Sequence, residues 1–177
     1  MDGNDIAAWQ GFFGIQAQVG ATLAGLLFVG LTISLQHLIG ARGYLSRGFT
    51  ALALQFEILV IGIFGLVPEQ SPQALGLELI AAGAIVLAGT QTFAHYFPED
   101  ENSKVLSGAG PLVTRTLLIG TSTLAPVIAG ASLVNGWPDA LYWLVPATIA
   151  AVYLSIGYAW VFAVEIPRRA EQERKDL

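Results

Sequence analysis

The chain has 177 residues, of which 54% are hydrophobic and only 12% are charged, and it contains no cysteine. Soluble domains carry about 25% charged residues, so this chain has too little charge to cover an ordinary surface with water-facing groups. The lack of cysteine excludes disulfides, thiolate metal sites and thiol catalysis. The net charge of −5 comes without a basic stripe, which argues against nucleic-acid binding. We therefore expect a single domain, residues 1–177, in a lipid bilayer.

Long apolar stretches predict five transmembrane helices, because a bilayer core of about 30 Å needs roughly 20 apolar residues in a helix. The predicted spans cover about residues 15–39, 48–67, 74–97, 112–135 and 140–166. Pro68 and Pro167 mark the ends of the second and fifth spans. The segment before Val19 is rich in aromatic and amide side chains. We interpret it as an interfacial start of the first helix or as a helix that projects outward. The predicted fold is an all-α integral membrane bundle.

The positions of the basic residues predict how this bundle is oriented. With five spans, all eight lysines and arginines fall on one side of the membrane: Arg42, Arg47, Lys104, Arg115, Arg168, Arg169, Arg174 and Lys175. The other side carries Asp2, Asp5, Glu69 and Asp139 and no base. Because cytoplasmic loops carry an excess of basic residues, we predict an N-terminus outside and a C-terminus in the cytoplasm. The predicted location is the cytoplasmic membrane, crossed several times.

Small residues predict where the helices pack, since lipid gives no hydrophobic drive between helices and close contact needs small side chains. The first span has Ala17, Ala21 and Gly25 at four-residue spacing. Gly83 lies in a run of small residues in the third span, and Pro126 lies among alanines in the fourth. We expect these five residues to lie at helix contacts. The pattern leaves open whether those contacts are within one chain or between copies.

Glu57 is an acidic residue near the middle of the second span, ten residues after Arg47 and eleven before Pro68. A charged group at that depth costs at least about 2.5–3.5 kcal/mol on insertion scales. No lysine or arginine is predicted at the same level. We therefore expect an uncharged Glu57 carboxyl group that faces other helices or a water-filled cavity.

Other polar residues are predicted near the level of Glu57, and we group them with it as a mid-membrane polar layer. They are Gln91, Thr121, Ser122 and Thr123. Because Pro126 has no N–H, the Ser122 carbonyl lacks its helical donor, and a protonated Glu57 could donate to it. One interpretation is a proton-linked or ion-linked carboxyl in a permeation path. The other is a satisfied hydrogen-bond network that fixes the helix register.

Two histidines, His37 and His95, end the first and third spans near the predicted inner boundary. Two neutral imidazoles at one depth could ligate haem or a metal. The simpler interpretation is that both are interfacial histidines with solvated polar tips, so we predict neither a metal site nor a cofactor. The sequence has no glycine-rich phosphate loop, HExxH or GxSxG motif. We therefore do not expect an enzyme.

Two stretches of the sequence resemble a known group of proteins. They are residues 25–35, GLLFVGLTISL, and residues 65–78, GLVPEQSPQALGLE. Both are similar to segments of small, uncharacterised bacterial multi-pass membrane proteins, some of which are described as modulators of the FtsH membrane protease. The resemblance covers mainly residues 9–90. The modulator description implies a seven-span protein, whereas this sequence predicts five spans.

The sequence favours a small integral membrane protein that acts through helix–helix association, as an accessory subunit or a homo-oligomer. Its expected partners are the lipid bilayer and either itself or another membrane protein. One alternative is a small ion channel or proton-linked transporter that uses the polar layer around Glu57. A second alternative is a haem-binding membrane protein that uses His37 and His95.

Overall fold

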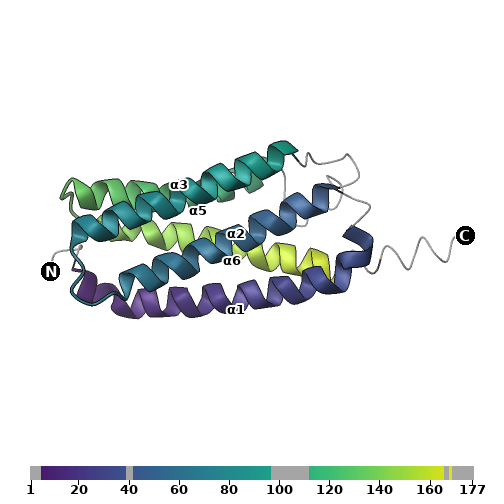
Figure 1. Cartoon of the computed structure of the whole chain (residues 1–177), viewed down its shortest axis with the longest axis horizontal. Coiled ribbons are helices and arrows are strands. Elements are labelled where there is room, and N and C mark those ends of the chain that lie inside the picture. The colour runs from purple at the N-terminus through teal and green to yellow at the C-terminus, as the bar shows by residue number, and fades with distance from the viewer. Residues whose placement is uncertain (1–4, 39–41, 97–111, 166–167, 169–177) are drawn as a thin grey trace, which may run out of the picture.

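The computed structural model describes residues 5–38, 42–96, 112–165 and 168, and every element in them is helical (Figure 1). In chain order they are α1 (Ile6–Leu38), α2 (Arg42–Gly65), α3 (Pro72–Tyr96), α5 (Leu112–Val134), the 3-10 helix η1 (Ala140–Trp143), α6 (Leu144–Trp160) and the π-helical turn η2 (Val161–Glu165). Five stretches of the described chain are long and apolar enough to cross a membrane, the last of them through η1 and α6. This confirms the predicted all-helical, five-helix architecture. Lys104 and the basic tail after Arg168 lie outside the described residues.

Short polar side chains cap the N-termini of two helices, α1 and α3. At the start of α1, the Asp5 carboxylate accepts a hydrogen bond of 3.1 Å from the Ala7 N–H. At the start of α3, the Ser71 hydroxyl accepts one of 3.2 Å from the Ala74 N–H. Pro72 occupies the first position of α3, where a backbone N–H would have no partner within the helix. These caps satisfy helix donors that would otherwise be unpaired.

The turn after α5 is a glycine-terminated helix end. Gly136 has a φ of 67°, a left-handed conformation that glycine adopts without strain. The N–H of Trp137 donates to the Ser132 carbonyl at 2.9 Å, and that of Gly136 donates to Leu133 at 3.1 Å. This pair of bonds is the Schellman motif. The Gly-Trp-Pro-Asp segment, residues 136–139, therefore reverses the chain between α5 and η1.

The first helix differs from the prediction because α1 begins at Ile6, well before residue 15, and continues without a break past Val19. The Phe13 side chain is fully buried and lies against Gly65, near the end of α2. The ring of Trp9 contacts the edge of Tyr142 in η1, with ring centres 5.0 Å apart. The segment before Val19 is thus part of one long helix packed in the bundle, and it is neither separate nor projecting.

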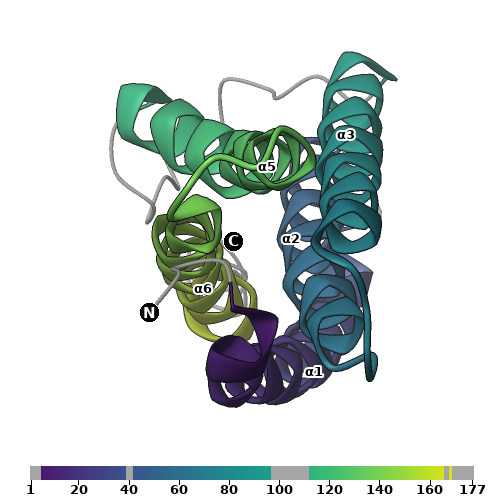
Figure 2. The same cartoon turned by 90° about the vertical axis from the view of Figure 1, so that its left-hand side faces the viewer.

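The helices form a ring when viewed along the bundle (Figure 2). Going round it, α1 packs on α2, α2 on α3, α3 on α5, α5 on α6 and α6 on α1. The closest pairs are α1 with α2 and α3 with α5. Helix α2 also contacts α6 across the ring, so their buried side chains fill its middle. The core is divided into two apolar clusters, one toward each end of the bundle.

Glycines allow the two closest pairs to approach. A Cβ on Gly62 of α2 would lie 2.6 Å from the Ala17 nitrogen and 2.7 Å from the Phe13 carbonyl of α1. In the other pair, a Cβ on Gly83 of α3 would lie 2.7 Å from the Thr123 carbonyl of α5. Real Cβ atoms do not approach backbone atoms so closely, so any larger residue at these positions would push the helices apart.

The five residues predicted to lie at helix contacts are divided by the structure. Ala17 and Gly83 lie at the close approaches just described, and Pro126 is buried inside α5. Ala21 and Gly25 are exposed, and a Cβ on Gly25 would meet nothing within 4 Å. Within the described chain, Ala21 and Gly25 are therefore not at a close helix approach, and a contact between copies stays a prediction. The α1 surface that packs on α2 includes Gly20 instead.

We expect the change Gly62→Ala to lower the free energy of unfolding by about 1–3 kcal/mol, the usual cost of overpacking. The physical reason is the contact with the α1 backbone. The change Gly157→Ala is the matched control, since a Cβ there meets nothing within 4 Å and alanine favours helix by up to about 1 kcal/mol. Denaturation in detergent, followed by circular dichroism, measures both. Equal midpoints for the two variants would contradict the close approach.

Candidate functional site

Two buried glutamines connect α1 and α2 to α6. The Gln16 amide donates to the Thr148 hydroxyl at 2.8 Å. The Gln55 amide donates to the Ala151 carbonyl at 3.2 Å and also to the Ser155 hydroxyl. Each bond joins helices that are far apart in the sequence. Neither glutamine was predicted as a site residue, although amide side chains within apolar spans were the available signal.

The level of Glu57 follows from helix contacts on both sides of α3. The rings of Phe49 and Phe93 are stacked with centres 4.2 Å apart. The two helices run antiparallel and rise equally per residue. Glu57, eight residues after Phe49 in α2, therefore lies level with Ile85, eight residues before Phe93 in α3. Gly83 of α3 lies against the Thr123 carbonyl of α5. Glu57 therefore lies near the level of Thr123, as the predicted depths require.

Glu57 is buried, with 3% of its side chain exposed. Among the described residues, its buried Oε1 atom has no hydrogen-bond partner. The nearby hydroxyls of Ser122 and Thr123 both donate to the Ile119 carbonyl, at 3.0 and 2.9 Å. The predicted bond from Glu57 to the Ser122 carbonyl is not formed. Within the described part of the chain, no hydrogen-bond network joins Glu57 Oε1 to its neighbours, so the satisfied network stays a prediction.

The predicted polar layer does not form one group. Glu57, Ser122 and Thr123 are buried, but Gln91 and Thr121 are exposed. The fixed rise of a helix sets the depth of a residue, whereas its direction around the axis depends on how the helices pack. Gln91 lines a cavity between α2, α3 and α5 that Glu57 does not line.

The two histidines considered for haem are not both described. His95 is exposed, and its ring lies edge-on to Tyr96 with centres 5.7 Å apart. The side chain of His37 lies outside the described part of the chain. Over the described residues, no three or more His, Asp or Glu side chains gather as metal ligands would. Haem binding through this pair stays a prediction.

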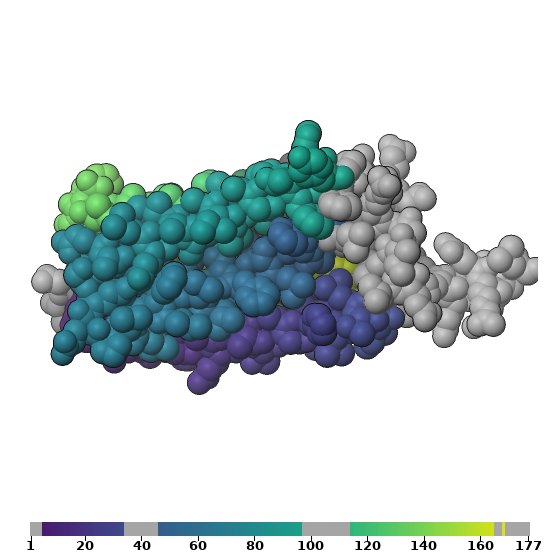
Figure 3. Space-filling model, viewed as in Figure 1, coloured from purple at the N-terminus to yellow at the C-terminus, as the bar shows by residue number. Residues whose placement is uncertain are grey.

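One face of α1 points away from the bundle, and we call it the outward face of α1. Seven residues make nearly two helical turns, and every seventh residue along this face is small or polar. They are Gly11, Gln18, Gly25 and Thr32, and between them lie Gly14, Ala21 and the exposed Phe28. A Cβ on Gly11, Gly14 or Gly25 would meet nothing within 4 Å. Figure 3 shows α1 along one edge of the molecule, beside α2.

Gln18 lies at the centre of this face and near the middle of the apolar stretch Ile6–Ile33. It is exposed, and its amide makes no hydrogen bond within the described chain. The exposed hydroxyls of Thr22 and Thr32 differ, because each donates to a carbonyl of its own helix at 2.8 Å. Gln18 therefore presents both a donor and an acceptor on an otherwise apolar or internally bonded surface.

Comparison with known proteins gives no relative for this chain. No family model, curated protein or solved structure matches it. The resemblance noted in residues 9–90 is therefore without support from these comparisons.

Gln55 and Glu57 should respond oppositely to replacement by methionine. We expect Glu57→Met to raise the free energy of unfolding by about 1–3 kcal/mol, because it removes the buried Oε1 atom, which has no hydrogen bond in the described chain. We expect Gln55→Met to lower it by about 0.5–2 kcal/mol, because the bonds to α6 are lost. Equilibrium unfolding in mixed micelles measures both. A loss of stability in Glu57→Met as large as that in Gln55→Met would show that Glu57 is satisfied.

Proposed function

We propose that this is a multi-pass protein of the cytoplasmic membrane that acts by helix association, with two copies bound through the outward face of α1. The five long apolar helices support membrane insertion. The charge distribution supports an N-terminus outside and a C-terminus in the cytoplasm. The observation that carries the association is Gln18, an amide in the middle of the outward face.

In a bilayer, Gln18 would face hydrocarbon, where an amide without a partner is costly. A second copy would insert with the same orientation and place its own Gln18 at the same depth. An amide is both donor and acceptor, so two copies related by a two-fold axis satisfy each other. This is an isologous contact, in which one surface binds its own copy.

The remaining residues of the face favour a close parallel pair. Gly11, Gly14, Ala21 and Gly25 leave room for a second backbone, as small residues do at membrane helix contacts. A seven-residue repeat favours left-handed packing along the whole helix. A single amide in such a repeat fixes the register and the number of strands. We infer a parallel dimer with α1 at its centre.

The alternative of proton-linked permeation depends on Glu57, whose buried Oε1 atom has no hydrogen-bond partner among the described residues. The described cavity between α2, α3 and α5 is lined by other residues. Self-association is favoured because Gln18 identifies the surface that binds, and because the Gln18 of a second copy is its matching partner.

The dimer predicts a specific cross-link. The chain has no cysteine, so Gly25→Cys introduces a unique thiol at the seam. We expect this variant to form a disulfide dimer under mild oxidation in liposomes. Leu26→Cys is the control, because it is also exposed but lies about 100° around the helix. Adding Gln18→Leu to Gly25→Cys should weaken association about 5- to 30-fold, the equivalent of about 1–2 kcal/mol for a membrane hydrogen bond.

Dilution with lipid supplies the measurement, since the weakened variant should need a higher protein-to-lipid ratio to reach the same cross-linked fraction. Equal cross-linking through positions 25 and 26, or no effect of Gln18→Leu, would overturn this interface. Gly157→Leu on α6, also in open space, should leave the cross-linked fraction unchanged.

The orientation is tested at the two ends of α3. Gln73 and His95 are both exposed and lie at opposite ends of this helix. In intact cells, we expect a membrane-impermeant maleimide to label Gln73→Cys and to spare His95→Cys until the membrane is opened. The reverse result would invert the topology. Labelling of both in intact cells would contradict a membrane-spanning α3.

A further inference from the structure

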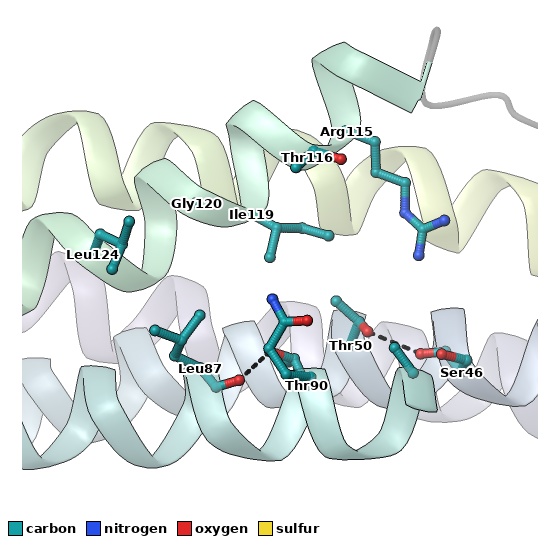
Figure 4. A pocket seen from close by; sticks show the side chains of 11 residues that line it. Ser46, Thr50, Leu87, Thr90, Arg115, Thr116, Ile119, Gly120 and Leu124 are labelled. Atoms are coloured by element: carbon teal, nitrogen blue, oxygen red, sulfur yellow. Dashed lines mark hydrogen bonds between the residues drawn. The ribbon is translucent and has the colours of Figure 1, made fainter. Parts of the chain in front are cut away.

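The cavity between α2, α3 and α5 lies toward the end of the bundle where α2 begins and α3 ends. Its volume is about 400 Å³, which is within the usual range of about 300–1,000 Å³ for small-molecule sites. Figure 4 shows Arg115 reaching from α5 into the space above Ser46 and Thr50 of α2. Leu87, Ile119 and Leu124 line its more apolar part. The cavity therefore has a polar part and an apolar part.

The polar part of the cavity is rich in hydrogen-bond donors. The hydroxyls of Thr50 and Thr90 donate to the carbonyls of Ser46 and Leu87, at 2.9 and 3.0 Å, so they offer acceptors only. The Ser46 hydroxyl and the Gln91 amide add donors to those of Arg115. Ser46 is only 1% exposed, so its hydroxyl belongs to the buried lining of the cavity.

Arg115 gives the cavity a positive charge. Its side chain is half-buried, and the guanidinium carbon lies 5.9 Å from the centre of the Tyr158 ring on α6. This is a cation–π distance, which steadies the guanidinium. A guanidinium in a donor-rich site matches oxyanions, because it can give two parallel hydrogen bonds to phosphate.

We propose that this cavity binds the phosphate oxyanion of an anionic phospholipid, held by Arg115, Ser46 and Gln91. The apolar side chains of Leu87, Ile119 and Leu124 continue from the polar part and accept the start of an acyl chain. Basic pockets between membrane helices suit such headgroups. This ligand site goes beyond the proposed self-association and uses none of the residues of the outward face of α1.

The test uses the delipidated full-length protein in detergent, with native mass spectrometry and thermal unfolding as readouts. The probes are phosphatidylglycerol, phosphatidylcholine and inorganic phosphate. We expect phosphatidylglycerol to bind and to raise the unfolding midpoint more than the other two. Arg115→Gln should weaken this binding at least about tenfold, since a charge-assisted, bidentate pair is lost. Arg168→Gln is the control, because Arg168 is exposed and outside the cavity.

A second variant tests the cavity without removing its charge. Gly120 lines the cavity, and a Cβ there meets nothing within 4 Å. Gly120→Leu should fill the space and abolish phosphatidylglycerol binding, while Gly157→Leu on α6 should not. Undiminished binding to both Arg115→Gln and Gly120→Leu would overturn the site. Equal stabilisation by inorganic phosphate would overturn the phospholipid as its ligand and leave a free oxyanion.

Discussion

The contact of glycine backbones between α1 and α2, and between α3 and α5, sets which side chains of these four helices face the bundle. Gly62 touches Ala17 and Phe13, while Gly20 lies against Leu59. Contacts at two levels fix both the register of α1 on α2 and its rotation. With that rotation fixed, Phe13 and Gln16 point inward. Residues about half a turn away from these, including Gln18, then point outward.

The glutamines near the middle of α1 and α2 show what this rotation decides. Gln16 and Gln55 face α6 and donate to it. Gln18 is two residues from Gln16, about 200° around the helix, so it cannot reach the same partner. An apolar solvent gives no replacement for a missing hydrogen bond. The same chemical group is therefore a structural link inside the bundle and, in the proposed dimer, the group that joins two copies.

The sequence predicted well how deep a residue lies along the bundle, but poorly which way its side chain points around the helix axis. The spans could be found because apolar length and charge depend on the rise of a helix, which is constant. Glu57 and Thr123 were placed at one level for the same reason. Which way a side chain points depends on packing, and α1 carries small residues on more than one side. Ala21 and Gly25 fit the expected spacing as well as Gly20 does, but only Gly20 faces α2.

The cavity could not be found from the sequence, because its walls come from three helices. In the sequence, Arg115 served only as one of the basic residues that predict the orientation, at one end of a span. Its meeting with Ser46, Thr50 and Gln91 depends on how α5 lies over α2 and α3. Within a single helix, Thr50 only donates to the Ser46 carbonyl, as many buried threonines do. The donor-rich wall exists only once the helices are assembled.

The cavity and the outward face of α1 share one element, since α2 lines the first and supports the second. Ser46 and Thr50 lie on α2 at the cavity, and Gly62 of the same helix holds α1. Binding in the cavity could affect the dimer by shifting α2 along α1. Such a shift would drive the α1 backbone against the helix backbone around Gly62, because the contact leaves no free space. A close-packed interface transmits small movements as discrete steps or not at all. The tight α1–α2 contact therefore opposes a gradual shift of α2 as a link between the proposed ligand site and the proposed dimer.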